Sequence, residues 1–451
     1  MKPKTSAKSS DAKTTAEELI SRLYEDILQE HCVVFVGAGS TTERHYWRTE
    51  PSFYQEIKAK ANFPGTDPPP SFPELMEYFC NRMDGGRHNR LIREAVARIE
   101  RFAVPGEDHN LATMFGDELA EIPYFNRFVT TNWDPFLERS LEVMIPTVED
   151  RDLAFWDDRK RQVLKIHGCI TRPYSIVATT TDYEGCIRDN PLIFNKLKDL
   201  MATKTFLFVG YSLRDSDFQF IWDGIVKSLG RFTKLAYAID PNARPDSLRY
   251  WKSRGIELFA TTDVMFVRRL RARLEKENLL PAESFLGFLH QERGRIANVH
   301  IRMDQQSSGG LASAMYQDGL LHALGNILTS TALGAKKIET FESDLAEARK
   351  MLAKMHRRKD PIEIAYWTGR TEILGRFLAR SKQKIPTFIH PFRFKPSQKF
   401  VKGWDHLVER PPAFTLPPPA CYPHYCHQDK SKLRTGVHQV SVSQRAKEIC
   451  H

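Results

Sequence analysis

Four short polar motifs, each directly after a run of apolar residues, contain the side chains of this 451-residue chain that are best suited to chemistry. They are Gly37-Ala38-Gly39-Ser40-Thr41, Thr130-Thr131-Asn132-Trp133-Asp134, Lys165-Ile166-His167-Gly168 and Gly210-Tyr211-Ser212-Leu213. Neighbouring glycines let backbone amides close on a diphosphate, and hydroxyl groups add further donors. A histidine takes a proton from a hydroxyl or a water near neutral pH, and an asparagine offers a donor and an acceptor that suit the placement of a water. The four motifs together indicate a site that binds a phosphorylated ligand and transfers a proton.

Each motif taken alone has an ordinary structural explanation. Strand-to-helix turns often hold two glycines for packing, and Asp134 is well placed to cap a following helix. A single histidine such as His167 is more often a packed structural residue than a catalyst. Gly210, followed by Asp215 and Asp217, combines a glycine turn with a helix-capping signature. The functional interpretation therefore depends on the motifs lying side by side.

The runs before the motifs are rich in β-branched and aromatic residues and predict buried strands. We expect strands at residues 32–37, 127–132, 163–168, 175–180, 205–210, 235–240 and 255–260. Helices are expected at 15–29, in several stretches across 54–119, from about 134, at 191–201, from about 215 and from 264. This alternation predicts an α/β fold with a doubly wound, Rossmann-like parallel sheet and a helical insertion. Such sheets bind ligands beyond the carboxyl ends of their strands, where all four motifs lie.

The strand pattern fades after about residue 289, so the C-terminal region is expected to be mainly helical or irregular. Helices are predicted at 310–333, 339–355 and 361–378, and the stretch beyond 386 is rich in proline, aromatic and basic residues. We expect a disordered leader at 1–14, without the apolar core of a secretory signal. The α/β domain is expected at 15–280 and a basic C-terminal domain at 290–451, with the boundary within 277–295.

Five pieces of sequence, in order, resemble the sirtuin family: FVGAGS, FVTTNWD, LKIHG, SIVATTTDY and FVGYSLRDSDF. They are more similar to the sirtuin-like domains of bacterial anti-phage effectors than to protein deacetylases. The resemblance spans residues 32–240, roughly half of the chain. It implies that the α/β domain binds NAD as a substrate and breaks the bond between nicotinamide and ribose.

The resemblance also implies roles for individual residues. His167 matches the catalytic histidine, Asn132 the asparagine that contacts the nicotinamide-side ribose and positions water, and Asp134 the aspartate near the carboxamide. Asp240 lies where the adenosine ribose is usually met. The implied cofactor-binding residues are Gly37, Ala38, Gly39, Ser40, Thr41, Thr131, Gly210, Ser212 and Asp240.

Three departures from the family pattern narrow the expected function. Ser40 and Thr41 stand where an apolar residue and then a serine are usual, which leaves open the hydroxyl that faces the cofactor. Trp133 replaces a tyrosine or isoleucine. The paired C-x-x-C zinc module of deacetylating sirtuins is absent after His167, where the α/β domain has only Cys169 and Cys186. No metal is therefore expected, and protein deacylation is disfavoured.

We expect an NAD glycohydrolase that depletes cellular NAD as an anti-phage defence effector. One alternative is a module that senses NAD or ADP-ribose and assembles with a partner ATPase or nuclease. Protein deacylation is a further alternative.

The net charge of +10 is concentrated at the C-terminal end, where residues 351–451 carry about +12. Arg357, Arg358 and Lys359 form one basic cluster, and a second is interleaved with aromatic residues: Lys382, Lys384, Arg393, Lys395, Lys399 and Lys402, with Phe388, Phe392, Phe394, Phe400 and Trp404. Cations with aromatic rings can follow a phosphate backbone and stack bases. The same surface also suits a protein partner or self-assembly, so the nucleic-acid and protein alternatives remain open, and a homo-oligomer is expected.

The cysteines point to a reducing compartment, and the apolar runs are too short to indicate a membrane span. Seven cysteines spread over this length do not resemble a disulfide framework. The group Cys421, His424, Cys426 and His427 lacks the usual zinc-ligand spacing. No run is apolar and long enough to span a membrane, so a cytoplasmic protein with no membrane partner is expected.

Overall fold

A six-stranded parallel sheet forms the centre of the α/β part, in the order β3-β2-β1-β4-β5-β6. The computed structural model describes residues 6–44, 51–66, 68–82, 87–213, 216–301 and 308–380. The strands are β1 (Cys32–Val36), β2 (Arg127–Thr130), β3 (Gln162–Lys165), β4 (Thr205–Val209), β5 (Ala236–Ile239) and β6 (Ile256–Phe259). All neighbouring pairs are parallel, which confirms the doubly wound, Rossmann-like prediction.

Helices cover both faces of this sheet, and β1 shows why its sequence is apolar throughout. Val34 and Val36 enter one core, whereas Val33 and Phe35 enter the other. The first core lies beneath α1 (Ser6–Leu28), α5 (Glu107–Ala120), α6 (Phe136–Ser140) and α11 (Asp263–Lys276). The second lies beneath α8 (Pro191–Thr203), α9 (Ser216–Leu229) and α10 (Pro245–Ser253). A strand covered on both faces has no polar side, so a continuous apolar run is expected.

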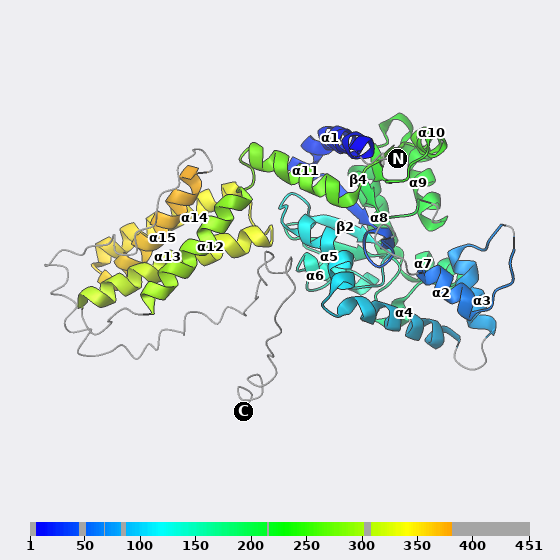
Figure 1. Ribbon diagram of the computed structural model, residues 1–451, viewed down its shortest axis with the longest axis horizontal. Helices are drawn as coiled ribbons and strands as arrows, with labels where there is room; N and C mark the ends of the chain where they lie inside the picture. Colours follow the sequence, from blue (N-terminus) through cyan, green and yellow to red (C-terminus); the bar gives the residue numbers. More distant parts are fainter. Residues whose placement is uncertain are drawn as a thin grey trace, which may run out of the picture.

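The helical insertion after β1 packs into a separate core beside the sheet. It comprises α2 (Phe53–Lys60), α3 (Phe72–Arg82) and α4 (Arg87–Ala103). Their buried side chains meet Ile176 and Ala178 from the segment before α7 (Thr180–Asp189). Figure 1 shows these helices grouped at one corner of the α/β part.

The strand predicted at 175–180 is wrong. That segment is a short 3-10 turn, Pro173–Ser175, followed by extended residues and the start of α7. The outer edge of β3 is already paired, because the Thr147 N–H donates to Val163 (2.9 Å) and the Lys165 N–H donates to Thr147 (2.8 Å). The alternating apolar residues are buried, but they pack against the insertion helices instead of extending the sheet.

Four helices after the sheet form a bundle with its own core. They are α12 (Glu283–His300), α13 (Ser308–Ala332), α14 (Ile338–Arg358) and α15 (Pro361–Arg380), drawn at the left of Figure 1. The backbones of α13 and α15 approach so closely that a Cβ at Gly319 would lie 2.0 Å from the Tyr366 carbonyl oxygen. Phe285 and Leu289 of α12 already belong to this core. We therefore propose the division between the two parts at 277–282, at the start of the predicted boundary region.

The turn between α13 and α14 is fastened to the amino-terminal edge of the sheet. The Arg161 guanidinium donates to the Leu333 carbonyl oxygen (2.7 Å) and to the Ala120 carbonyl oxygen (2.9 Å). Lys337 forms an ion pair with Glu30, just before β1. The bundle therefore contacts the edge of the sheet opposite to the four motifs.

Both ends of the chain bear on the sequence predictions. α1 starts at Ser6, so residues 6–14 are helical where a disordered leader is predicted. Arg357, Arg358 and Lys359 are exposed at the end of α14. The second basic cluster and the group from Cys421 to His427 lie outside the described residues.

Candidate functional site

The register of the sheet brings the ends of four strands together where the strand order reverses. Val36 of β1 is paired with Thr130 of β2 and with Val209 of β4, and Thr130 is paired with Lys165 of β3. The residues directly after these four are Gly37, Thr131, Gly210 and Ile166, and the next are Ala38, Asn132, Tyr211 and His167. Neighbouring strands lie about 4.8 Å apart, so all four motifs meet at one carboxyl edge.

The two glycine turns pack directly against each other. The Gly37 N–H donates to the Val209 carbonyl oxygen and the Gly39 N–H to the Gly210 carbonyl oxygen, both at 2.9 Å. A Cβ at Gly37 would lie 2.4 Å from the Gly210 oxygen, and a Cβ at Gly210 would lie 2.2 Å from the Ser40 nitrogen. These glycines therefore permit close backbone approach between two loops. The amide protons of Gly37 and Gly39 are used within the protein, whereas the sequence predicts that such amides face a diphosphate.

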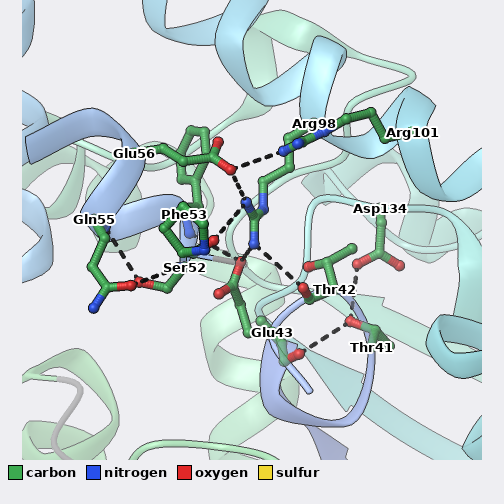
Figure 2. A network of polar contacts seen from close by, with 12 residues as sticks. Thr41, Thr42, Glu43, Ser52, Phe53, Gln55, Glu56, Arg98, Arg101 and Asp134 are labelled. Atoms are coloured by element: carbon green, nitrogen blue, oxygen red, sulfur yellow. Dashed lines mark hydrogen bonds and ion pairs between the residues drawn. The ribbon is translucent and has the colours of Figure 1, made fainter. Parts of the chain in front are cut away.

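Asn132, Thr41 and Asp134 form a buried polar chain at this edge. Asn132 Nδ2 donates to Thr41 Oγ1 (3.0 Å), and Thr41 Oγ1 donates to Asp134 Oδ2 (3.2 Å); Figure 2 shows the Thr41–Asp134 contact. Asp134 Oδ1 accepts from the Phe136 N–H (3.1 Å), so the predicted capping role and the site role coexist. The sequence leaves open whether the hydroxyl of Ser40 or that of Thr41 faces the cofactor. The hydroxyl of Thr41 is already hydrogen-bonded to protein groups.

A buried ion pair lies next to this chain of hydrogen-bonded side chains. Lys165 is fully buried, and its Nζ lies 3.0 Å from Glu138 Oε1 and donates to the Asp134 carbonyl oxygen at 2.7 Å. Burial raises the pKa of Asp134, and the positive charge of Lys165 acts in the opposite direction. Burial works to lower the pKa of Lys165, but the charges of Glu138 and its neighbours outweigh it and raise that pKa. Lys165 therefore supplies a fixed positive charge next to Asp134.

His167 is buried at 3% exposure and held by a tyrosine. The Tyr183 hydroxyl lies 3.3 Å from His167 Nδ1, and the two rings meet edge-on with centroids 4.9 Å apart. The His167 carbonyl oxygen accepts from the Val177 N–H at 3.1 Å. The next residue, Gly168, has a φ of +84°, which favours glycine. The segment before α7 fixes the backbone of His167, and Tyr183 of α7 fixes its ring.

Two buried arginines hold the loop that follows Thr41. Arg44 forms an ion pair with Asp263 at the start of α11. Arg98 of α4 lies 2.6 Å from Glu43 and 2.6 Å from Glu56, and it joins the loop to the insertion helices (Figure 2). Neither arginine was predicted to be buried, because single arginines in a basic chain carry no local signal of burial.

Several residues important to the geometry have weak sequence signals. Thr130 is fully buried, and its hydroxyl donates to the Val36 carbonyl oxygen (2.8 Å) and accepts from the Asn132 N–H (3.0 Å). Tyr183 belongs to the SIVATTTDY piece, so the resemblance contained it without assigning a role. Lys165 lies within a run that predicts a strand, and a strand prediction does not reveal a buried charge.

The remaining predicted site residues lie at or near the same edge with fewer contacts. Thr131 is half-buried and Ser212 is exposed. Asp240 follows β5, and its Oδ1 accepts from the Asn242 N–H at 2.9 Å, which stabilises a turn. Asp215 lies outside the described residues, as does the side chain of Asp217.

Within the part of the chain that the structure describes, no cluster of three or more His, Cys, Asp and Glu side chains could hold a metal ion, and no helix is long and apolar enough to cross a membrane.

Comparisons with known proteins show what this chain is similar to. Residues 126–259 match the family model described as a SIR2-like domain. The chain is 28% identical over 260 residues to the NAD(+) hydrolase ThsA of Bacillus cereus (strain MSX-D12), which covers 54% of this chain and 51% of that protein. It is 27% identical over 228 residues to the NAD(+) hydrolase ThsA of Cytobacillus dafuensis, with 48% and 42% covered.

A third relative has a different name. The chain is 23% identical over 253 residues to Defense-associated sirtuin 2 of Bacillus subtilis, covering 53% of this chain and 24% of that protein. The chain thus spans about half or less of the length of these curated relatives. The family match starts at residue 126, so the Gly37–Ser40 turn lies outside it and is placed here by the sheet register. Residues 126–259 thus match a SIR2-like domain, and about half of the chain is similar to proteins named as NAD(+) hydrolases and as a defence-associated sirtuin.

Proposed function

We propose that this chain binds NAD at the carboxyl edge of its sheet and hydrolyses the bond between nicotinamide and ribose in a defence role. The observation that carries the proposal is the position of His167 beside Asn132. The two residues follow neighbouring strands, each two residues beyond the paired Thr130 and Lys165. Relatives named as NAD(+) hydrolases and as a defence-associated sirtuin support the same chemistry and role.

The reaction needs a nucleophile, a proton acceptor and a fixed substrate. Nicotinamide leaves with the electron pair of the C–N bond, and the sugar passes through an oxocarbenium-like state. A water oxygen then bonds to the same carbon and transfers a proton to the His167 imidazole. Asn132 holds the water or a ribose hydroxyl, since its carbonyl oxygen is an acceptor without a hydrogen-bond partner among the described residues. Fixing these groups in place supplies several kcal/mol of the barrier.

Release of nicotinamide from NAD by the purified chain tests the proposal. We expect turnover in the wild type and a loss of about 100-fold or more in His167→Ala and Asn132→Ala. His31→Ala is the matched control, because His31 is exposed at the opposite edge of the sheet. NAD content is also measured in cells that express each variant, before and after phage infection. This measurement detects activity that requires a cellular trigger.

Two results would count against the proposed site. Nicotinamide release that survives both His167→Ala and Asn132→Ala would place the chemistry elsewhere. NAD binding without turnover, in the purified chain and in infected cells, would instead indicate a sensing module.

A further inference from the structure

We propose that Thr41 is a positioning residue that determines which end of the Asn132 amide is presented to the substrate. Its hydroxyl, held by Asp134, binds the amide nitrogen and leaves the carbonyl oxygen to accept from the water or ribose hydroxyl. The inference rests on the proposed NAD hydrolysis and assigns a step within it.

The three side chains are brought together from two neighbouring strand ends. Thr41 follows β1, and Asn132 and Asp134 follow β2. Their exposures are only 5%, 5% and 3%, respectively, so bulk water does not compete for their hydrogen bonds. The Asn132 backbone is fixed as well, because its N–H donates to the buried Thr130 hydroxyl.

Counting protons determines the direction of each hydrogen bond. The Thr41 hydroxyl has one proton, and its two nearby acceptors are Asp134 Oδ2 (3.2 Å) and the Ala38 carbonyl oxygen (3.5 Å). With Asp134 ionised, the form that the neighbouring Lys165 charge favours, its carboxylate accepts hydrogen bonds and donates none, as does the Ala38 carbonyl. Whichever of them takes the proton, the Thr41 oxygen can only accept from Asn132. The amide group that faces Thr41 at 3.0 Å is therefore the NH₂.

The other arm of the planar amide is then the carbonyl oxygen. Asn132 Oδ1 is buried and has no hydrogen-bond partner within the described residues. A buried acceptor without a donor is costly, and native structures seldom retain one without a water or a ligand. The orientation imposed by Thr41 thus leaves an acceptor free for a donor from the substrate side, such as a water or a sugar hydroxyl.

Removing the hydroxyl abolishes this constraint. In Thr41→Val the side chain keeps its shape but neither accepts from the amide nor donates to Asp134. The Asn132 amide can then rotate by half a turn and present its NH₂, which cannot accept a hydrogen bond from a nucleophile. Thr41→Ser keeps the hydroxyl and therefore the orientation.

Steady-state kinetics with NAD, together with NAD binding by calorimetry, tests the inference on the full chain. We expect Thr41→Val to lower kcat about 10- to 100-fold while KM and the Kd for NAD stay within about threefold. Thr41→Ser should recover most of kcat. Thr261→Val is the matched control, because Thr261 is a buried threonine after β6 whose hydroxyl has no partner among the described residues.

The outcomes separate this inference from the proposed function. An inactive wild type contradicts NAD hydrolysis itself. An active wild type with an equally active Thr41→Val, or a Thr41→Ser variant as impaired as Thr41→Val, overturns the role of Thr41. If the valine variant does not fold, Thr41→Ala removes the hydroxyl without added bulk, and the same comparison with Thr41→Ser applies.

Discussion

The carbonyl oxygen of Gly210 accepts a hydrogen bond of 2.9 Å from the backbone N–H of Gly39, which joins the turn after β1 to the turn after β4. The two strands are neighbours in the sheet, and the strand order reverses between them. Ligands of doubly wound sheets bind at this point of reversal. The contact therefore fixes the two loops between which the proposed dinucleotide site lies.

Substitution of Gly210 by alanine is expected to damage both folding and binding. Gly210 has a φ of +60°, and a Cβ there would lie 2.2 Å from the Ser40 nitrogen. We expect Gly210→Ala to lower the free energy of unfolding by about 1–3 kcal/mol and to weaken NAD binding. Chemical denaturation and calorimetry measure the two effects. Gly224→Ala in α9 is the control, since nothing lies within 4 Å of its Cβ position, and unchanged NAD binding in Gly210→Ala would argue against the site.

Breaking the Lys165–Glu138 pair should strongly destabilise the fold. Lys165→Met leaves the Glu138 carboxylate buried without its cation, which typically costs about 3–5 kcal/mol of unfolding free energy. The double variant Lys165→Met/Glu138→Leu removes both charges and should recover part of that loss. Urea denaturation of the three proteins tests this. A double variant as unstable as the single one would show that the ion pair is not the cause.

Arg98 and Arg101 make a matched pair, because both contact Glu56 in Figure 2. The Arg98 side chain is 4% exposed and also binds Glu43, whereas that of Arg101 is 48% exposed. We expect Arg98→Met to cost about 3 kcal/mol of unfolding free energy and Arg101→Met less than about 1 kcal/mol. Equal losses, measured by denaturant titration, would contradict the anchoring role of Arg98.

The helical bundle should lose stability as the pH rises above neutrality. His300 lies 3.1 Å from Asp318, and the hydrogen bond to that carboxylate raises the pKa of His300 above 6.5. The folded bundle thus binds this proton more tightly than the unfolded chain. Its contribution is complete below pH 6.5 and is lost as the pH rises through the raised value. Melting temperatures between pH 6 and pH 8.5 should show the decline, and Asp318→Asn should flatten it.

The sequence was sufficient to predict the sheet and the edge at which the four motifs meet. Apolar runs such as the one at Val33 and Phe35 mark strands buried on both faces, and parallel strands present their carboxyl ends on one side. His167 and Asn132 were selected as candidates because both follow such runs and lie in pieces that resemble the sirtuin family. The wrong strand prediction at 175–180 has a physical origin. An alternating pattern of apolar residues indicates which side chains are buried, but it does not indicate whether a strand of the sheet has a free edge for pairing.

The supporting groups could not be predicted, because their roles depend on partners far away in the chain. Glu138 becomes the counter-ion of Lys165 only after α6 packs on β3. Tyr183 reaches His167 only because α7 starts where it does. The sequence of α4 likewise gives no sign that Arg98 binds two carboxylates, because Glu43 and Glu56 lie outside this helix. Such long-range pairing follows from tertiary packing and not from local spacing.

The position of β1 between β2 and β4 has a consequence for the nascent chain on the ribosome. The ribosome synthesises the Gly37 turn before its partner Gly210, which is added only after the insertion helices and β3 have been translated. Chains that terminate before that point lack the second half of the dinucleotide site. Unfinished copies of a protein proposed to destroy NAD would therefore be harmless to the cell that makes them.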